Sequence, residues 1–315
     1  MINPNLFGID NSLQVPSIPY MGNKRKLATR IINTITDLLG QDFEHFYDLF
    51  GGGGSMSVAA LNLWGVDVHY NELNTAIANL MKHIQDGGEI PYNWVTREEF
   101  FKHIGGDTWY DGLVQSVWSF GNKQSSYLYG KDIEDLKLLG HKVCVEKDFD
   151  SLEKLENLCG FSIPIDFKNG VQEIRLQLKN IIEENKSEIR LQHLERLNLI
   201  EHLQRLQHLQ ALQALQALHI TNKSYEEVKI QKNSVIYCDP PYKGTEEYKE
   251  GGFDHERFYK WCRSIECPVF ISEYKMPDDF KLVASFEHKS TLSATNNDKK
   301  VMENLYWNGK TIFSK

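Results

Sequence analysis

The sequence predicts an α/β fold in which a doubly wound, mostly parallel sheet is interrupted by a largely helical insertion. Residues 46–85 follow the order strand, glycine loop, helix, strand, helix, which is a βαβ unit. Parallel strands need such crossover connections, so a sheet covered by helices follows. The same pattern returns after residue 228 and is absent between residues 98 and 225.

The strands and helices of the first half are marked by their periodicity. Residues 46–50 are apolar and end in four glycines, and the helical pattern of residues 56–65 stops at a fifth glycine. Residues 66–70 alternate with period two, and residues 71–85 return to helical spacing.

In the second half, residues 234–239 and 268–274 are expected strands on either side of a helix at 254–266. The tail, at 281–290 and 303–310, has the pattern of antiparallel edge strands. We therefore expect residues 1–97 and 226–315 to form one split domain, with residues 98–225 inserted into it.

The insertion contains a Leu/Gln-rich array at residues 191–218, in which leucine or isoleucine recurs at every third position. A step of three residues covers about 300° of an α-helix, so the apolar stripe winds round the helix instead of keeping to one side. We expect a surface helix or a pair of helices with a partly disordered stretch. A dimerising zipper is the alternative, although its period differs from that of a coiled coil.

Composition indicates an ordinary globular protein. Of 315 residues 41% are hydrophobic and 25% are charged, and the net charge is −8. No apolar run reaches membrane-spanning length, and the odd number of cysteines, with no CxxC pair, suggests neither a disulfide framework nor a zinc site. We expect a cytoplasmic protein without a metal. The acidic total does not exclude nucleic acid, because phosphate binding needs only a local basic patch. Residues 23–26 and 296–300 are candidate patches, although each taken alone is better explained as a solvated face.

Two segments of the first half suggest a nucleoside cofactor. The glycines at 51–54 stand between a strand and a helix, where a ligand can approach the backbone, and Glu72 follows at the end of the next strand. An acid about 20 residues after the glycines is placed to bind ribose hydroxyls. The pattern is not GxGxxG, so a cofactor without a diphosphate fits better than NAD. If "IPYMGNK" returns to this loop, Tyr20 and Lys24 close over the cofactor.

The run Asp239–Pro240–Pro241–Tyr242 follows an apolar strand and forms a rigid strand exit. An exocyclic amine of a nucleobase is a poor nucleophile, because its lone pair is delocalised into the ring. The Asp239 carboxylate and a proline carbonyl can hold its two N–H bonds out of the ring plane, while Tyr242 offers a stacking face. Alone, the run is better explained by a strand that ends at prolines, with an incidental tyrosine.

Together these motifs resemble the Dam-like N6-adenine DNA methyltransferases, in which a glycine motif precedes target recognition and DPPY follows. "YMGNK", "DLFGGGGS", "NELN" and "DPPY" match in order, and the tail is similar as well. Leu49 stands where the family usually has proline, and Glu72 replaces the commoner aspartate. The resemblance implies a Rossmann-like methyltransferase fold, with 98–225 as the target-recognition region.

The resemblance also implies the activity, a methyl transfer from S-adenosylmethionine to N6 of a flipped adenine in double-stranded DNA. It suggests a bacterial or phage setting and a cognate restriction endonuclease as a partner. The implied catalytic residues are Asp239, Pro240, Pro241 and Tyr242, and the implied cofactor-binding residues are Tyr20, Lys24, Phe50, Gly52, Gly54, Glu72 and Asp239. The residues expected to contact DNA are Lys123, Tyr127, Asn297, Lys299 and Lys300.

Other functions stay open at this point. An N4-cytosine, RNA or protein amine methyltransferase would use the same scaffold, although cytosine enzymes of this type usually carry serine where Asp239 stands. A non-catalytic DNA-binding regulator would not need the intact motifs. An NAD- or nucleotide-binding protein leaves DPPY unexplained.

Overall fold

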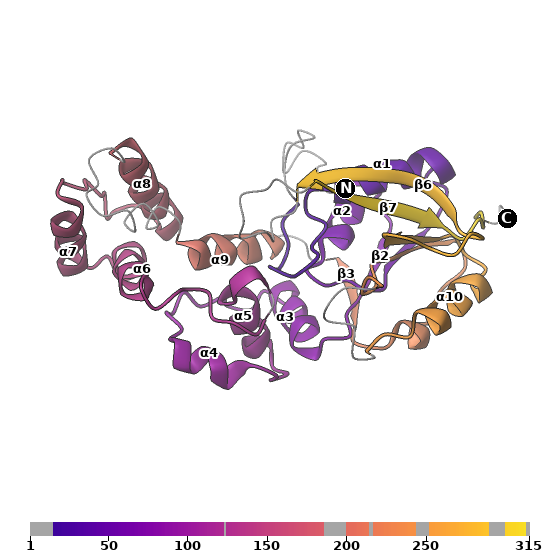
Figure 1. Ribbon diagram of the computed structural model, residues 1–315, viewed down its shortest axis with the longest axis horizontal. Helices are drawn as coiled ribbons and strands as arrows, with labels where there is room; N and C mark the ends of the chain where they lie inside the picture. The colour runs from indigo at the N-terminus through magenta and orange to yellow at the C-terminus, as the bar shows by residue number, and fades with distance from the viewer. Residues whose placement is uncertain are drawn as a thin grey trace.

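The computed structural model describes residues 15–122, 124–185, 200–213, 217–243, 252–289 and 300–312. The molecule is elongated, with an α/β part at one end and a lobe of helices at the other (Figure 1). No helix of the described residues is long and apolar enough to cross a membrane.

One seven-stranded sheet carries the α/β part, in the order β3-β2-β1-β4-β5-β7-β6. The five strands from β3 to β5 are parallel to their neighbours, and β7 runs antiparallel to both β5 and β6. The predicted α/β class with a mostly parallel sheet is therefore confirmed. The strands are β1 (His45–Asp48), β2 (Asp67–Asn71), β3 (Leu218–Thr221), β4 (Ser234–Cys238), β5 (Val269–Glu273), β6 (Lys281–Lys289) and β7 (Lys300–Trp307).

The strand order reverses beside β1. The chain passes from β1 outward to β2 on one side, and β4 pairs with β1 on the other side, with Asp48 aligned with Tyr237. The segments that follow β1 and β4 therefore leave the sheet at the same edge and next to each other. This switch point is where open α/β sheets bind their ligands.

Successive residues of the central strands face two different hydrophobic cores. Phe46, Val235 and Tyr237 pack with the helices α1 (Ala28–Leu39), α2 (Ser55–Leu63) and α3 (Thr75–Gln85). Tyr47, Ile236 and Cys238 pack with α10 (His255–Ser264) on the opposite face. Because both faces are covered, the strands read as continuous apolar runs, as in "SVIYC".

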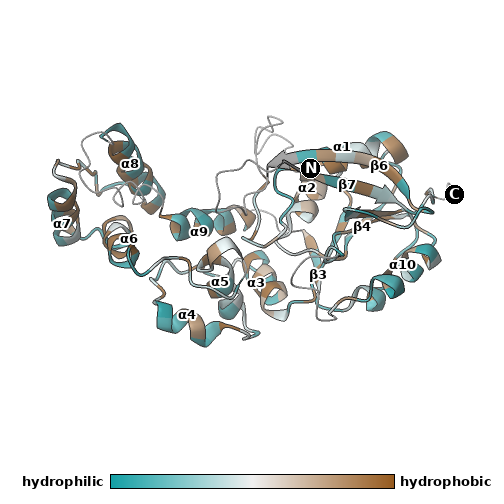
Figure 2. Cartoon of the chain, viewed as in Figure 1, coloured by the Kyte–Doolittle hydropathy of each residue, from teal (hydrophilic) through white to brown (hydrophobic). Residues whose placement is uncertain are grey.

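Between β2 and β3 the chain builds the helices of the lobe. Capping boxes at Thr96 and Thr108 begin the first two of them, and α5 packs on α3 of the α/β part. Figure 2 shows both apolar and hydrophilic residues on each of these helices. The helices are α4 (Arg97–His103), α5 (Trp109–Val117), α6 (Glu134–His141), α7 (Phe149–Cys159) and α8 (Val171–Glu184).

The described part of the Leu/Gln-rich array forms α9 (Glu201–Leu212), and α9 is not a surface helix. Leu203, Leu206, Leu209 and Leu212 are all buried. The helix lies between the lobe and the α/β part and contacts α3 and α5 on one side and α8 on the other. A stripe that winds round a helix suits a helix with packing partners on several sides, so the expected surface position was wrong. Residues 191–199 and 214–216 lie outside the described residues.

The array also runs into the sheet, because its last leucine begins β3, which pairs with β2. The sheet thus resumes at Leu218, inside the range expected for the insertion, and the predicted boundary at residue 226 comes too late. The division of the chain into a split domain and an inserted one otherwise stays a prediction.

Candidate active site

The site begins where β1 and β4 end. Asp48 is the last residue of β1, and Asp239 comes directly after β4. Because these strands are paired in parallel, their exits bring the glycine loop and the Asp239–Tyr242 run to one edge of the sheet.

The glycine loop is shaped by close contacts within the protein itself. Gly54 takes a φ of 80° and begins α2, a left-handed conformation that favours glycine. At Gly53 an added Cβ would lie 2.3 Å from the carbonyl oxygen of Ile18. The backbone of Ile18 also donates a hydrogen bond of 2.9 Å to the carbonyl of Gly53. The loop therefore needs glycine at Gly53 so that the segment before α1 can pack on it.

That N-terminal segment returns to the loop, which was the condition for Tyr20 and Lys24 to close over a cofactor; the closure itself stays a prediction. Asn23 fixes its shape, since its side-chain amide donates to Ser17 Oγ at 2.7 Å and to the carbonyl of Ile18 at 2.9 Å. The ring of Tyr20 lies against Gly52, where an added Cβ would be 3.0 Å from the ring. Lys24 is thereby directed toward the end of β4.

Lys24 makes two ion pairs in a buried position. Its Nζ lies 2.6 Å from Asp239 Oδ2 and 3.2 Å from Glu303, a residue of β7. Burial opposes the charge of Lys24, but the attraction of the two carboxylates outweighs it and raises the pKa of the ammonium. One cation is thus shared by two carboxylates.

The pKa of the Asp239 carboxyl is unusually high for an ion-paired acid. Burial raises its pKa to about 6, Lys24 acts in the opposite direction, and the nearby Glu303 carboxylate adds to the rise. Its second oxygen, Oδ1, is buried and has no hydrogen-bond partner among the described residues. A buried acceptor without a partner is costly and is typical of a place where a ligand binds.

Hydrogen bonds to several elements fix the residues around Asp239. The hydroxyl of Tyr242 donates to Glu303 at 3.0 Å, and His255, at the start of α10, donates from Nε2 to the carbonyl of Pro241 at 2.9 Å. Glu273, at the end of β5, accepts from the backbone of Lys243 at 2.7 Å. The strand exit is therefore rigid through its contacts as well as through its prolines. The carbonyl of Pro241 is already engaged, which leaves the Pro240 carbonyl as the better acceptor for a substrate.

A small cavity of about 60 Å³ connects these groups. Its lining brings together Asp239 with the predicted residues Tyr20, Lys24, Phe50 and Gly52. The ring of Phe50 packs against Tyr225 and two phenylalanines of the α10 side. The other lining residues are Met21, Gly22, Asn23, Asp48, Gly51, Gly53, Ser55, Met56 and Tyr237.

Asp48 belongs to this site and was missed in the residue prediction. It lines the cavity, and its carboxylate accepts from the backbone and the hydroxyl of Ser57 at 3.1 and 2.8 Å. Burial raises the pKa of Asp48 to about 7 against these hydrogen bonds, with Asp239 and Glu72 adding to the rise. A signal existed in the sequence, because Asp48 is the acidic first residue of "DLFGGGGS", the segment that contains the glycine motif.

Glu72 lies at the glycine loop but is not among the residues that line the cavity. Its two carboxylate oxygens accept from the backbone of Gly52 and Asn74, each at 2.7 Å. Burial raises the pKa of Glu72, and these backbone hydrogen bonds work against that rise. Glu72 therefore orders the loop, and its contact with a ribose stays a prediction.

Of the residues predicted to contact DNA, one is buried and the others lie wholly or partly outside the described residues. Tyr127 is 5% exposed, and its hydroxyl donates to the carbonyl of Val95 at 2.7 Å. Tyr127 therefore belongs to the hydrophobic core, and its buried position does not support the expected contact with DNA. Lys123, Asn297 and Lys299 lie outside the described residues, and of Lys300 only the backbone, in β7, is described.

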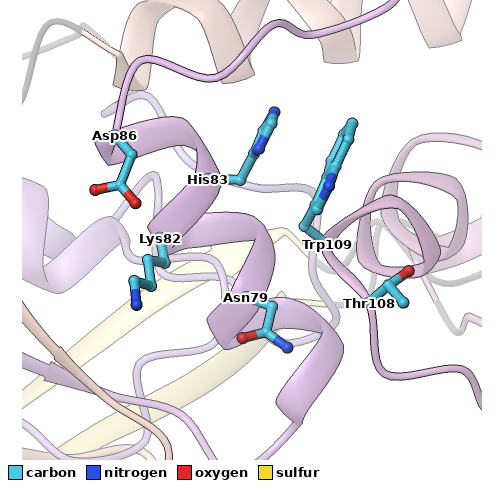
Figure 3. Close-up of a pocket in the computed structure, with 6 residues that line it drawn as sticks. All are labelled: Asn79, Lys82, His83, Asp86, Thr108 and Trp109. Carbon is cyan, nitrogen blue, oxygen red and sulfur yellow. The ribbon is translucent and has the colours of Figure 1, made fainter.

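A larger hollow of about 320 Å³ lies elsewhere, on α3 and the start of α5 (Figure 3). Within it the rings of His83 and Trp109 stack in parallel, with centroids 3.7 Å apart. None of the predicted site residues lines this hollow. We place the functional site at the smaller cavity because Asp48 and Asp239 both line it, and Asp239 Oδ1 has no hydrogen-bond partner among the described residues.

Comparison with known proteins supports this assignment. Residues 20–106 match the model of a family described as D12 class N6 adenine-specific DNA methyltransferase. The matched range contains Tyr20, Lys24, the glycine loop and Glu72, and it ends before the Asp239–Tyr242 run. The predicted resemblance is confirmed over these residues. A comparison with curated proteins found no match.

Proposed function

We propose, on the premise that residues 20–106 place this chain among the D12 class adenine-specific DNA methyltransferases, that it methylates N6 of adenine in double-stranded DNA from S-adenosylmethionine. The observation that carries the proposal is the arrangement of Asp239, whose Oδ2 is fixed by Lys24 while the buried Oδ1 has no partner among the described residues. Such an oxygen is suited to accept an N–H of the substrate.

The residues of the cavity suit this cofactor. Asp48 and Asp239 line the cavity, and Lys24 is the one ammonium among its described lining residues, so the surroundings favour a ligand with positive charge. The rings of Tyr20 and Phe50 line the same cavity and can stabilise a cation by their π-faces. Glu72 is the proposed acceptor for the ribose hydroxyls. When bound there, S-adenosylmethionine would supply an electrophilic methyl group on a sulfonium, with the neutral thioether as the leaving group.

The chain's own residues prepare the adenine amine. Asp239 Oδ1 and the carbonyl of Pro240 accept its two N–H groups and hold them out of the ring plane, which localises the lone pair on nitrogen. Positioning of this kind accounts for a large part of the barrier reduction in group transfer. The nitrogen carries a surplus proton after transfer, and Asp239, with its pKa of about 6, is the nearest base.

Adenine inside a duplex cannot reach this cavity, so we propose that the target base is flipped out of the stack. Tyr242 would then stack on the base, and the region between β2 and β3 would contact DNA on either side of it. A cognate restriction endonuclease and a cytoplasmic location are part of the same proposal.

The test is incorporation of a labelled methyl group from S-adenosylmethionine into duplex DNA, followed by long-read mapping of N6-methyladenine. Wild-type protein should label adenine in a defined sequence, and Asp239→Asn should reduce turnover by more than about 100-fold, in line with the loss of general acid–base help. The matched control is Glu266→Gln, an exposed carboxylate of the loop between α10 and β5, which should retain full turnover.

Label on cytosine, on RNA or on protein would contradict the proposed substrate. Near-normal turnover of Asp239→Asn would contradict the role of Asp239. Absence of any methyl transfer, with intact cofactor binding by calorimetry, would favour a non-catalytic DNA-binding protein.

A further inference from the structure

Glu303 is a buried carboxylate beside Lys24 and Tyr242 that was not among the site residues predicted from the sequence. It lies in β7 near the carboxyl end of the chain and is 5% exposed. Its Oε1 lies 3.2 Å from Lys24 Nζ and accepts the hydroxyl of Tyr242 at 3.0 Å. Lys24 and Tyr242 are the two groups that flank Asp239, so a single oxygen of Glu303 holds both.

Burying the charge of Glu303 costs folding free energy. Lys24 already has one carboxylate partner in Asp239 at 2.6 Å, so a second carboxylate leaves a buried surplus of negative charge. Burying a charge costs several kcal/mol unless it is fully compensated. A neutral hydrogen-bond acceptor would hold Tyr242 and Lys24 as well, so the charge itself calls for a function.

We propose that Glu303 is a positioning residue for methyl transfer: it fixes Lys24 and Tyr242 beside Asp239, and its negative charge makes Asp239 the better proton acceptor. This inference rests on the proposed function. The proton concerned is the one that the amine nitrogen must lose once its bond to the methyl carbon has formed, and Asp239 Oδ1 receives it.

The charged and titratable groups around Asp239 come from every neighbouring element. Lys24 precedes α1, Asp48 ends β1, Tyr237 lies in β4, Tyr242 and Tyr274 follow β4 and β5, and Glu303 lies in β7. Lys24 is the sole cation in this set of described residues. The like charge of Glu303 adds to burial in raising the pKa of Asp239, and removing that charge must lower it.

The decisive variant is Glu303→Gln, because glutamine keeps the oxygen that accepts from Lys24 and Tyr242 but loses the charge. In the profile of kcat against pH, the rise on the acidic side (the acidic limb) should move to lower pH. The kcat at pH 8 should fall by about tenfold. Affinity for S-adenosylhomocysteine, measured by calorimetry, should change by less than about twofold, since Glu303 does not line the cavity. Glu303→Ala, which loses the oxygen as well, should lose a further tenfold in kcat.

A second readout does not depend on catalysis. Carbon-13 labelling of aspartate carboxyls allows the Asp239 resonance of the free protein to be titrated by NMR, with Asp239→Asn for its assignment. The midpoint should fall in Glu303→Gln and stay unchanged in the control Glu266→Gln. Glu303→Asp, which keeps the charge, should keep the wild-type acidic limb with a reduced kcat, and it serves if the glutamine variant does not fold.

An Asp239 midpoint and an acidic limb that stay at their wild-type pH in Glu303→Gln would overturn the inference. If wild-type protein itself transferred no methyl group to DNA, the proposed function would fail instead. The NMR titration would still report whether Glu303 acts on Asp239.

Discussion

Lys24 and Asp239 are separated by 215 positions along the chain, and their side chains meet at 2.6 Å. The ion pair joins the segment that covers the glycine loop to the strand exit that carries the DPPY run. The proposed cofactor-binding residues and the proposed base-binding run are therefore positioned relative to each other by one ammonium group.

Replacing Lys24 by methionine should leave Asp239 and Glu303 buried without a cation. We expect the free energy of unfolding to fall by about 3 kcal/mol at pH 8, the usual cost of removing one partner of a buried pair. Without Lys24 the pKa of Asp239 rises further, so this carboxyl binds a proton more tightly in the folded state than in the unfolded state. The loss should therefore be smaller at pH 5.5, where Asp239 can be protonated.

The measurement is urea unfolding of wild type and Lys24→Met at both pH values. A loss that is equal at pH 5.5 and pH 8 would show that the ammonium contributes through its contacts and not through its charge. Lys102→Met is the matched control, because Lys102 is an exposed lysine paired with Glu98 on α4.

Asp48 should make the free protein less stable as the pH rises. Its folded pKa, about 7, lies above the ordinary value of 3.8, so the folded state binds this proton more tightly than the unfolded state does. The resulting stabilisation is fully present below pH 3.8 and is lost progressively as the pH rises through about 7. Asp48→Asn removes the titration and can still accept from Ser57.

Urea unfolding between pH 4 and pH 8 checks this expectation. The variant should be more stable than wild type at pH 8 by a few kcal/mol, because each tenfold difference in proton affinity between the folded and unfolded states is worth about 1.4 kcal/mol. A variant that is less stable than wild type at pH 8 would contradict it. Asp239 carries a raised pKa as well, so a smaller dependence of the same sign should persist in Asp48→Asn.

Arg205 of α9 should be needed for the stability of the lobe. Its guanidinium donates to the carbonyls of Ser116, Val117 and Ser119 at 3.2, 2.8 and 2.7 Å, where α5 ends. Arg205→Met would leave these carbonyls without their donor, at a cost of about 2–4 kcal/mol in unfolding free energy, from the penalty of unsatisfied buried groups. Arg257→Met, which removes an exposed pair with Glu226, should have little effect.

Hydrogen exchange of the amides at 116–122 gives a local measure of the same effect. Exchange should accelerate there in Arg205→Met while the strands of the sheet keep their protection. Uniform acceleration over the whole chain would mean that α9 supports the molecule as a whole.

Much of the α/β part follows from local pattern. The apolar runs that form β1 and β4 are buried on both faces, and the helical spacing of α3 and α10 matches their buried sides within a few residues. Asp239 and the glycine loop could also be expected at one edge, because parallel strands around a switch point end together.

Contacts between residues that are far apart in the sequence cannot be predicted from local pattern. The position of Glu303 depends on β7 inserting between β5 and β6, and no periodicity along the tail reports that order. The apolar stripe of α9 winds round the helix and so does not define a single buried face. Which side of the helix is buried depends on packing partners that are distant in the sequence. The polar neighbours of Tyr127 suggest a surface residue, whereas its ring packs inward.

The position of β7 has a consequence for how the protein is made. Glu303 emerges from the ribosome after the other named groups of the candidate site, and β7 must then enter between two strands that precede it in the sequence. Lys24 can pair with Asp239 before β7 is made, but it gains its second carboxylate partner only with β7. A nascent chain that has not yet reached β7 therefore lacks the contacts of Glu303 with Lys24 and Tyr242.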